Sequence, residues 1–141
     1  MTKYDMQDHG PNPYVVKLDE ATVANPNYRT TVWTGAHLQL TLMCIPPGGD
    51  IGLEVHPHTD QFLRFEQGTG ETRMGPTEDE VTFTAEVGPE MAVFVPAGTW
   101  HNVVNTGDDE LKVYTLYGPP NHVPGTLHPT QHDAEIDPNE D

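Results

Sequence analysis

The chain of 141 residues is long enough for one domain with a sizeable apolar core. Six basic residues against 22 acidic ones give a formal net charge of −16, which disfavours binding to nucleic acid and to anionic membrane surfaces. No apolar run approaches the length of a membrane span, no secretory leader is visible, and the single cysteine excludes an internal disulfide, so the sequence favours a cytoplasmic protein.

The polar residues 1–27 predict an N-terminal arm, with a short strand over 14–17 and one helix over 19–25 that ends before Pro26. Later segments rich in Val, Thr, Phe, Tyr and Leu predict strands over 28–34, 37–45, 61–67, 80–87, 91–96, 100–105 and 110–117. Strands at this spacing, without helical patterns between them, indicate an all-β sandwich or barrel over residues 28–118. Residues 119–141 form a Pro-rich, acidic C-terminal extension, which either wraps over the barrel or is disordered near its end.

Two histidines, His56 and His58, precede the strand expected over 61–67. In an extended chain, residues i and i+2 point to the same face, so the two imidazoles would lie side by side. Two imidazoles on one face suit a metal ion better than a core. Gln61 follows two residues after His58, and its amide would join them at the polar mouth of a barrel.

A second segment, VPAGTWHNVVN (95–105), has the spacing Pro96-x-Gly98-x-x-His101-x-x-x-Asn105. This spacing predicts a tight turn that leads into a strand on which His101 and Asn105 point inward. We expect His101 to face the same cavity as the first pair of histidines, and Asn105 to form hydrogen bonds at the end of the strand.

Together, the two segments resemble the paired signatures of the cupin superfamily, HxH(x)E(x)6G and PxGxxHxxxN. The second match is complete. In the first, Gln61 stands where a glutamate usually stands, and it follows His58 at a shorter spacing than in the commonest cupin form. That spacing resembles the cupin domain of the type II mannose-6-phosphate isomerases. The wider sequence is similar to a group of small stand-alone bacterial and archaeal cupins that are often labelled isomerase-like.

The resemblance implies a double-stranded β-helix, the cupin or jelly-roll barrel, that pairs into a homodimer through its N-terminal strand. It also implies four metal ligands, His56, His58, Gln61 and His101. Such a set suits one divalent transition metal per chain, Fe, Mn, Zn, Ni, Co or Cu. Because all four ligands would be neutral, the ion would keep its full charge and attract an anionic or chelating oxygen compound. A barrel that has lost its metal is the alternative.

Several classes of function stay open. The first is a metalloenzyme acting on a small oxygenated molecule such as a sugar or hydroxyketone, in which Tyr117, Glu54 or His37 moves a proton. A non-haem metal dioxygenase is the other enzymatic version. A non-catalytic module that binds a small ligand or a metal, and a storage or structural role, complete the set.

Arg64 is the only basic side chain near the motif, and by strand parity it points away from Gln61, which disfavours a phosphate clamp.

Three further histidines have two interpretations each. His37 opens a predicted strand, and it either faces the cavity or is a half-buried polar residue. His122 and His128 lie in the C-terminal extension, where they belong either to a surface loop or to a lid that folds across the mouth of the barrel.

Overall fold

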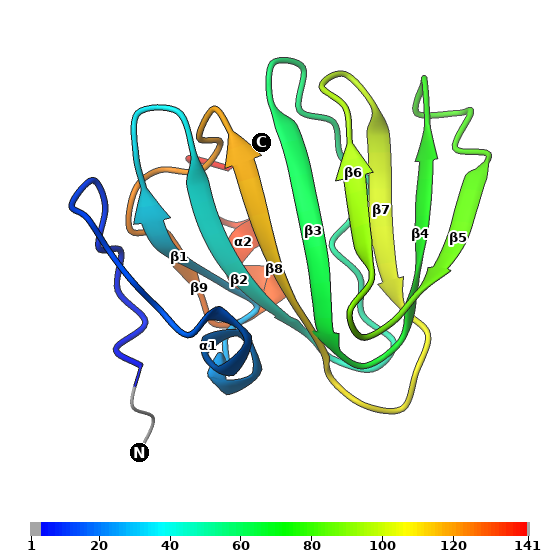
Figure 1. The fold of residues 1–141 in the computed structure, drawn as a ribbon. Helices are drawn as coiled ribbons and strands as arrows, with labels where there is room; N and C mark the ends of the chain where they lie inside the picture. The colour runs from blue at the N-terminus through cyan, green and yellow to red at the C-terminus, as the bar shows by residue number, and fades with distance from the viewer. Residues whose placement is uncertain (1–3, 141) are drawn as a thin grey trace.

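The computed structural model describes residues 4–140, which form mostly strands (Figure 1). The elements in chain order are α1 Leu18–Ala24, β1 Arg29–Thr34, β2 Gln39–Ile45, β3 Asp60–Gln67, β4 Gly70–Gly75, β5 Phe83–Val87, β6 Ala92–Val95, β7 Trp100–Asn105, β8 Leu111–Gly118, β9 Leu127–His128 and α2 Gln131–Glu135. The helices are short and lie near the two ends of the chain. The predicted all-β fold is therefore confirmed.

The strands form two antiparallel sheets (Figure 1). The larger sheet has the order β6-β3-β8-β2-β1-β9, and the smaller one has the order β5-β4-β7. Strands that are distant in the chain, such as β3 and β8, are direct neighbours, as in a jelly-roll barrel. One apolar cluster contains residues of both sheets, among them Leu63 of β3, Val113 of β8 and Val103 of β7. The core therefore lies between the two sheets.

The side chains of β3 point alternately to the inside and the outside of the barrel. Gln61, Leu63 and Phe65 are buried, whereas Phe62 and Arg64 are only partly buried. Successive side chains of a strand point to opposite faces, so the first set faces the second sheet and the other set faces outward. The prediction that Arg64 points away from Gln61 is confirmed.

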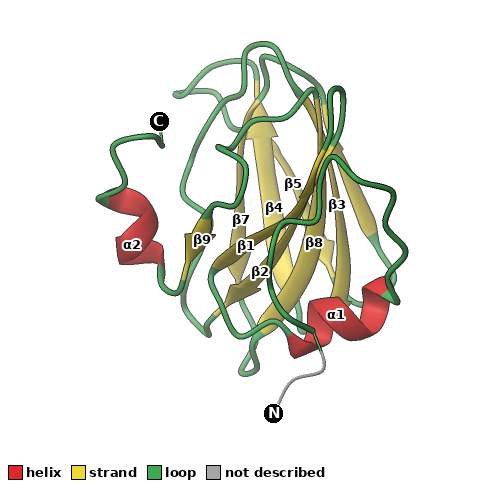
Figure 2. Ribbon diagram, turned by 90° about the vertical axis from the view of Figure 1, so that its left-hand side faces the viewer, coloured by secondary structure: helices red, strands yellow, loops and turns green. Residues whose placement is uncertain are grey.

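Strand β2 is buried along its whole length because both of its faces are covered. On the outer face, Leu40 and Leu42 pack against Ala21 of α1 in a second apolar cluster. Figure 2 shows α1 on one side of the strands and α2 with β9 on the other. Within residues 4–140, neither helix is long and apolar enough to cross a membrane.

Two expectations of secondary structure are wrong. Residues 14–17 run as irregular chain before α1 and form no strand. Strand β4 was not expected, because its sequence GETRMG has two glycines and only one residue that favours strands, Thr72. A tight turn after β3 leads the chain directly into β4. Gly68 has a φ of 87°, and a Cβ atom there would lie 2.6 Å from the Glu110 carbonyl oxygen, so only glycine lets the chain reverse into β4.

The C-terminal segment returns to the edge of the larger sheet. Strand β9 pairs with β1 and places His128 opposite Arg29. The buried Gln39 side chain donates to the His122 carbonyl oxygen at 2.8 Å and accepts from the His122 amide at 2.9 Å. A capping box then starts α2. These contacts hold the segment against the ends of β1 and β2.

Candidate metal centre

The segment that contains the first histidine motif lies beside β7. Glu54 and His101 form an isolated antiparallel bridge, in which the Glu54 amide donates to the His101 carbonyl at 3.0 Å and the His101 amide donates back at 2.9 Å. The Cβ atoms of such a pair lie about 5 Å apart on one face of the sheet. His56 is two residues beyond Glu54, and its side chain returns to the same place. Backbone pairing therefore brings these three side chains together.

Glu54, His56 and His101 form a compact cluster. The Glu54 Oε1 atom lies 3.3 Å from His56 Nε2 and 3.4 Å from His101 Nε2. All three ligand atoms lie within 4.8 Å of one another. Burial by itself raises the pKa of Glu54, but hydrogens on the two histidines beside it, which a bound metal ion would displace, outweigh that effect and hold the pKa of the carboxyl well below its usual range. An ionised carboxylate therefore faces the two ring nitrogens.

The cluster fits a metal ion. The ring of His101 is only 1% exposed, and its Nδ1 atom lies 3.0 Å from the Thr99 carbonyl oxygen. A carbonyl oxygen can only accept, so Nδ1 carries the hydrogen and Nε2 presents a lone pair to the cluster. Within the described chain, neither His56 Nε2 nor His101 Nε2 makes a hydrogen bond, despite their short distances to Glu54. Buried nitrogens of this kind need a partner, and coordination to a metal would supply one.

Gln61, which was expected as a ligand, lies close to this cluster. It is the partner of Tyr117 across β3 and β8, and its Nε2 atom donates to the Tyr117 hydroxyl at 3.3 Å. The Tyr117 ring in turn meets the His56 ring edge-on, with 5.6 Å between the centroids. The side-chain oxygen of Gln61 is buried and accepts no hydrogen bond from residues 4–140. It is thus a fourth atom available to a metal ion.

The structure does not bring His58 into the cluster. Residues 57–58 form a turn, so the rule that i and i+2 share a face does not hold between His56 and His58. His58 is exposed, and Glu54 is the second neighbour of His56 in its place. His37, one of the candidates for proton transfer, is exposed in the turn between β1 and β2.

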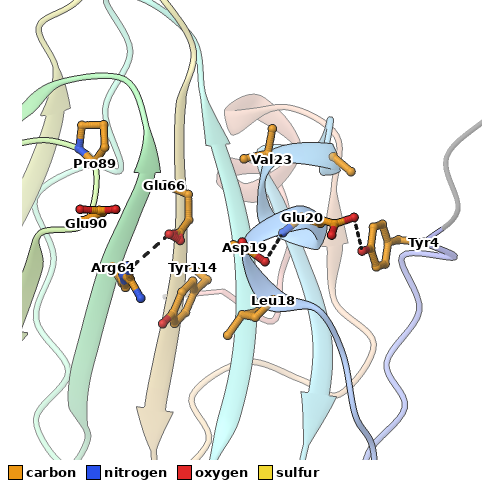
Figure 3. A pocket seen from close by; sticks show the side chains of 11 residues that line it. Tyr4, Leu18, Asp19, Glu20, Val23, Arg64, Glu66, Pro89, Glu90 and Tyr114 are labelled. Carbon is orange, nitrogen blue, oxygen red and sulfur yellow. Dashed lines mark hydrogen bonds and ion pairs between the residues drawn. The ribbon is translucent and has the colours of Figure 1, made fainter.

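A cavity of about 200 Å³ opens beside the cluster, with Glu54, Arg29 and Glu140 in its wall. A larger groove of about 930 Å³ lies on the outside of the barrel, between α1 and the strands β3 and β8 (Figure 3). Its side chains pair with one another across open surface, as Arg64 does with Glu66 at 3.7 Å. None of the residues that line the larger groove belongs to the metal cluster. The smaller cavity is therefore the better candidate for a ligand site.

Comparison with known proteins agrees with this arrangement of strands and histidines. The cupin domain family matches residues 41–117, more than half of the sequence, from β2 to β8. The chain belongs to the cupin superfamily. The matched region contains both histidine segments, so the predicted membership is confirmed. The closer resemblance to type II mannose-6-phosphate isomerases is not part of this result and stays a prediction.

Two curated proteins and one solved structure are similar to this cupin over most of its sequence. It is 53% identical to the uncharacterized protein YrkC of Bacillus subtilis (strain 168) over 129 residues, which are 92% of this chain and 69% of YrkC. It is 42% identical to the uncharacterized protein L612 of Acanthamoeba polyphaga mimivirus over 115 residues, 81% of this chain and 70% of L612. The crystal structure of BH2720 from Bacillus halodurans has a TM-score of 0.92 at 51% identity and covers 93% of this chain and 99% of that one.

Glu54 is the member of the cluster that sequence reasoning assigned to another role, that of a proton carrier. The spacing of the cupin motif contained the missing signal. Gln61 follows His58 after two residues but His56 after four. If Glu54-x-His56 takes the place of the expected pair, the spacing to Gln61 is no longer short, and the departure in spacing from the commonest cupin form disappears.

Proposed function

We propose that this cupin binds one divalent transition metal ion through Glu54, His56 and His101, with the amide oxygen of Gln61 as a fourth ligand. The observation that carries the proposal is the cluster itself, in which one carboxylate and two imidazoles converge within 4.8 Å. Imidazole, carboxylate and amide donors without a thiolate suit Fe, Mn, Zn, Ni, Co or Cu. His58 is left out of this set because it is exposed beyond a turn.

The protein is best explained as a metalloenzyme that acts on a small oxygenated molecule such as a hydroxyketone or a sugar. A bound divalent ion supplies Lewis acidity, which polarises a carbonyl oxygen. Because Glu54 cancels one of the two positive charges, the site would keep a single positive charge and not the double charge expected for four neutral ligands. That charge still favours an anionic or chelating oxygen compound.

Tyr117 is the side chain best placed to hold a proton beside the cluster. Burial raises the pKa of Tyr117 well above its usual value, so its hydroxyl stays protonated at neutral pH. The oxygen of this hydroxyl accepts from Gln61, and its hydrogen can be donated to a substrate oxygen. Tyr117 would therefore act as a hydrogen-bond donor and not as a base.

Isomerisation rests on the resemblance to the type II mannose-6-phosphate isomerases. A non-haem metal dioxygenase is the second candidate, and a specific observation favours it. Two imidazoles and one carboxylate with open positions are the ligand set of non-haem Fe(II) oxygenases, and Glu54, His56 and His101 make up such a set. A non-catalytic module that binds a small ligand through the same metal site is the third candidate.

Elemental analysis of untagged protein tests the metal site. We expect about one transition metal ion per chain in the wild type and almost none in His101→Ala, with the barrel still folded. His58→Ala is the matched control, because it removes an exposed imidazole, and it should keep the metal. Metal loss in His58→Ala together with retention in Glu54→Ala would contradict the ligand set.

The identity of the metal then separates the enzymatic candidates. Iron or copper directs the search to O₂ consumption with diketones or hydroxy acids, whereas zinc or manganese directs it to isomerisation of hydroxyketones and sugars. A protein that holds no metal and takes up none on reconstitution would end the enzyme proposal and leave the binding module.

The homodimer and the cytoplasmic location expected from the sequence stay predictions. Sedimentation equilibrium tests the first, and it should give about twice the mass of one chain, as cyclic dimers are the commonest closed oligomers. A monomeric mass would contradict pairing through the N-terminal strand.

A further inference from the structure

Arg29 is a buried arginine in a strongly acidic protein. It is the first residue of β1 and is only 4% exposed, with its guanidinium 5.2 Å from the centre of the Tyr28 ring. Burial of a guanidinium is unfavourable unless a charged or polar partner lies next to it. The partners of Arg29 therefore indicate what this position is able to hold.

The main partner of Arg29 is a carboxylate that is held at both of its oxygens. Arg29 Nη1 donates to Glu140 Oε1 at 2.8 Å, and His122 Nδ1 donates to Glu140 Oε2 at 2.9 Å. His128 Nδ1 lies 3.3 Å from the same guanidinium nitrogen. Side chains from β1 and from the segment pinned by Gln39 thus hold a single planar anion, and His128 of β9 lies against the guanidinium.

This arrangement has hydrogen-bonding capacity that Glu140 does not use. Arg29 Nε and His122 Nε2 are buried, and neither has a hydrogen-bond partner within residues 4–140. Because Nδ1 of His122 donates to Glu140 and burial lowers the pKa of this ring, Nε2 presents a lone pair. A clamp that only holds a glutamate leaves the Arg29 Nε–H without an acceptor, whereas a ligand with a further oxygen would accept from it.

The cavity described above is lined both by Arg29 and by one member of the proposed metal centre, Glu54. Arg29, Glu140 and Glu54 all lie in the wall of this space of about 200 Å³. One water takes up about 30 Å³, so the cavity has room for roughly six waters or for a molecule of a few carbon atoms. The His122 ring meets the Tyr117 ring edge-on with 5.0 Å between centroids. A small molecule bound at the guanidinium would therefore share the cavity with Glu54 of the metal cluster.

We propose that Arg29 and His122 form a subsite for the carboxylate of a small-molecule ligand. In the structure, the carboxylate of Glu140 occupies the place that the ligand carboxylate would take. The inference rests on the proposed function and narrows its ligand to a small carboxylate with a further oxygen for the metal. Glu140 can be displaced because its segment is lightly held: helix α2, just before it, has no fully buried residue. The exchange of one carboxylate for another leaves Arg29 paired throughout.

A carboxylate fits this subsite better than a phosphate does. The subsite offers one guanidinium and one neutral imidazole, and the carboxylates of Glu54 and Glu135 line the same cavity. A phosphate dianion would bring two negative charges close to these groups, whereas a carboxylate brings one. The contacts of Glu140 also have the planar, two-oxygen geometry that suits a carboxylate.

Calorimetric titration of malonate into the full chain tests the subsite. Glu140→Gln removes the internal competitor, so we expect the Kd for malonate to fall about ten-fold as more of the protein becomes competent to bind. Glu135→Gln is the matched control: it removes the same charge from the same cavity without a contact to Arg29, and its Kd should stay within about two-fold. Arg29→Lys keeps the charge but loses the guanidinium fork, and it should weaken malonate binding about ten-fold.

Malonate affinity that is unchanged in Glu140→Gln or in Arg29→Lys would overturn the subsite. Tighter binding of inorganic phosphate than of malonate would overturn its assignment to carboxylates. A lower melting temperature of Glu140→Gln without a gain in malonate affinity would show that Glu140 is a structural clamp only. Circular dichroism of each variant establishes that it is folded before titration.

The same titration separates this proposal from the metal site. If the protein takes up no metal but Glu140→Gln still gains affinity for malonate, the subsite stands and the proposed metalloenzyme falls. If the chain holds about one metal ion but Glu140→Gln gains nothing, the subsite falls and the metal site stands. Titration of chelator-treated protein then shows how much of the malonate affinity comes from Arg29 alone.

Discussion

The inner cavity and the outer groove each contain an arginine paired with a glutamate, and Figure 3 shows the outer pair, Arg64 and Glu66. Arg29 and Glu140 lie 2.8 Å apart with side chains 5% and 13% exposed, whereas Arg64 and Glu66 lie 3.7 Å apart with side chains 40% and 8% exposed. Water reaches the guanidinium of the outer pair and screens it, so this pair adds little stability. The inner pair has lost its hydration, and each partner depends on the other. Desolvation, more than the presence of an ion pair, distinguishes the candidate site.

The largest expected difference between inside and outside concerns the aromatic side chains. Phe65 is fully buried between the sheets, whereas Phe94 is 70% exposed and lies 5.0 Å from the Phe62 ring. Phe65→Ala leaves a cavity and should lower the free energy of unfolding by about 4 kcal/mol. Phe94→Ala loses one ring contact, worth about 1 kcal/mol. Urea unfolding measures both, and equal losses would show that the outer face is covered, for example in the expected homodimer.

The two arginines give the next largest difference. Arg29→Ala leaves the carboxylate of Glu140 without its guanidinium, and should lower the free energy of unfolding by about 3 kcal/mol. Arg64→Ala should change it by less than about 0.5 kcal/mol, because the outer pair is screened by water. Urea unfolding curves at low and high salt give both values, and salt should affect only the outer pair. A loss at Arg64 as large as that at Arg29 would contradict the comparison.

Strand alternation made part of this contrast predictable from the sequence. The inward side of β3 and the inward position of His101 follow from a two-residue period, which depends only on the geometry of a strand. Glu54 acquires its role from pairing with His101 on another segment, and Arg29 meets Glu140, which lies 111 residues further along. Local patterns contain no information on such contacts.

The same limit applies to the secondary structure. Strands with a high density of β-branched and aromatic residues were predicted, for example β8, whose sequence is LKVYTLYG. Strand β4 has only one such residue, Thr72, and is held between β5 and β7 in the smaller sheet. The turn at residues 57–58 was not predicted either, and that turn decides which side chain accompanies His56.

A third prediction compares two glutamines on β3. Gln61→Glu places a second carboxylate beside Glu54, which would leave the proposed divalent ion with no net charge. We expect the metal to stay bound and the affinity for oxalate to fall about ten-fold. Gln67→Glu makes the same substitution at the other end of β3 and is the control. Calorimetry with oxalate measures both, and tighter oxalate binding in Gln61→Glu would refute the charge argument.

The smallest expected effect is a pH dependence of the inner pair. Burial by itself raises the pKa of Glu140, but the hydrogen bond from His122 and the charge of Arg29 outweigh it, so the folded pKa lies below the ordinary value of 4.5. The stabilisation by this carboxylate is therefore present above pH 4.5 and is lost as the pH falls through the folded pKa. The difference in the free energy of unfolding between wild type and Glu140→Gln should be about 1 kcal/mol at neutral pH and shrink toward zero as the pH falls through the folded pKa of Glu140. A difference that stays constant across this range in urea unfolding would show that the charge of Glu140 does not contribute, and that Arg29 is satisfied by neutral partners alone.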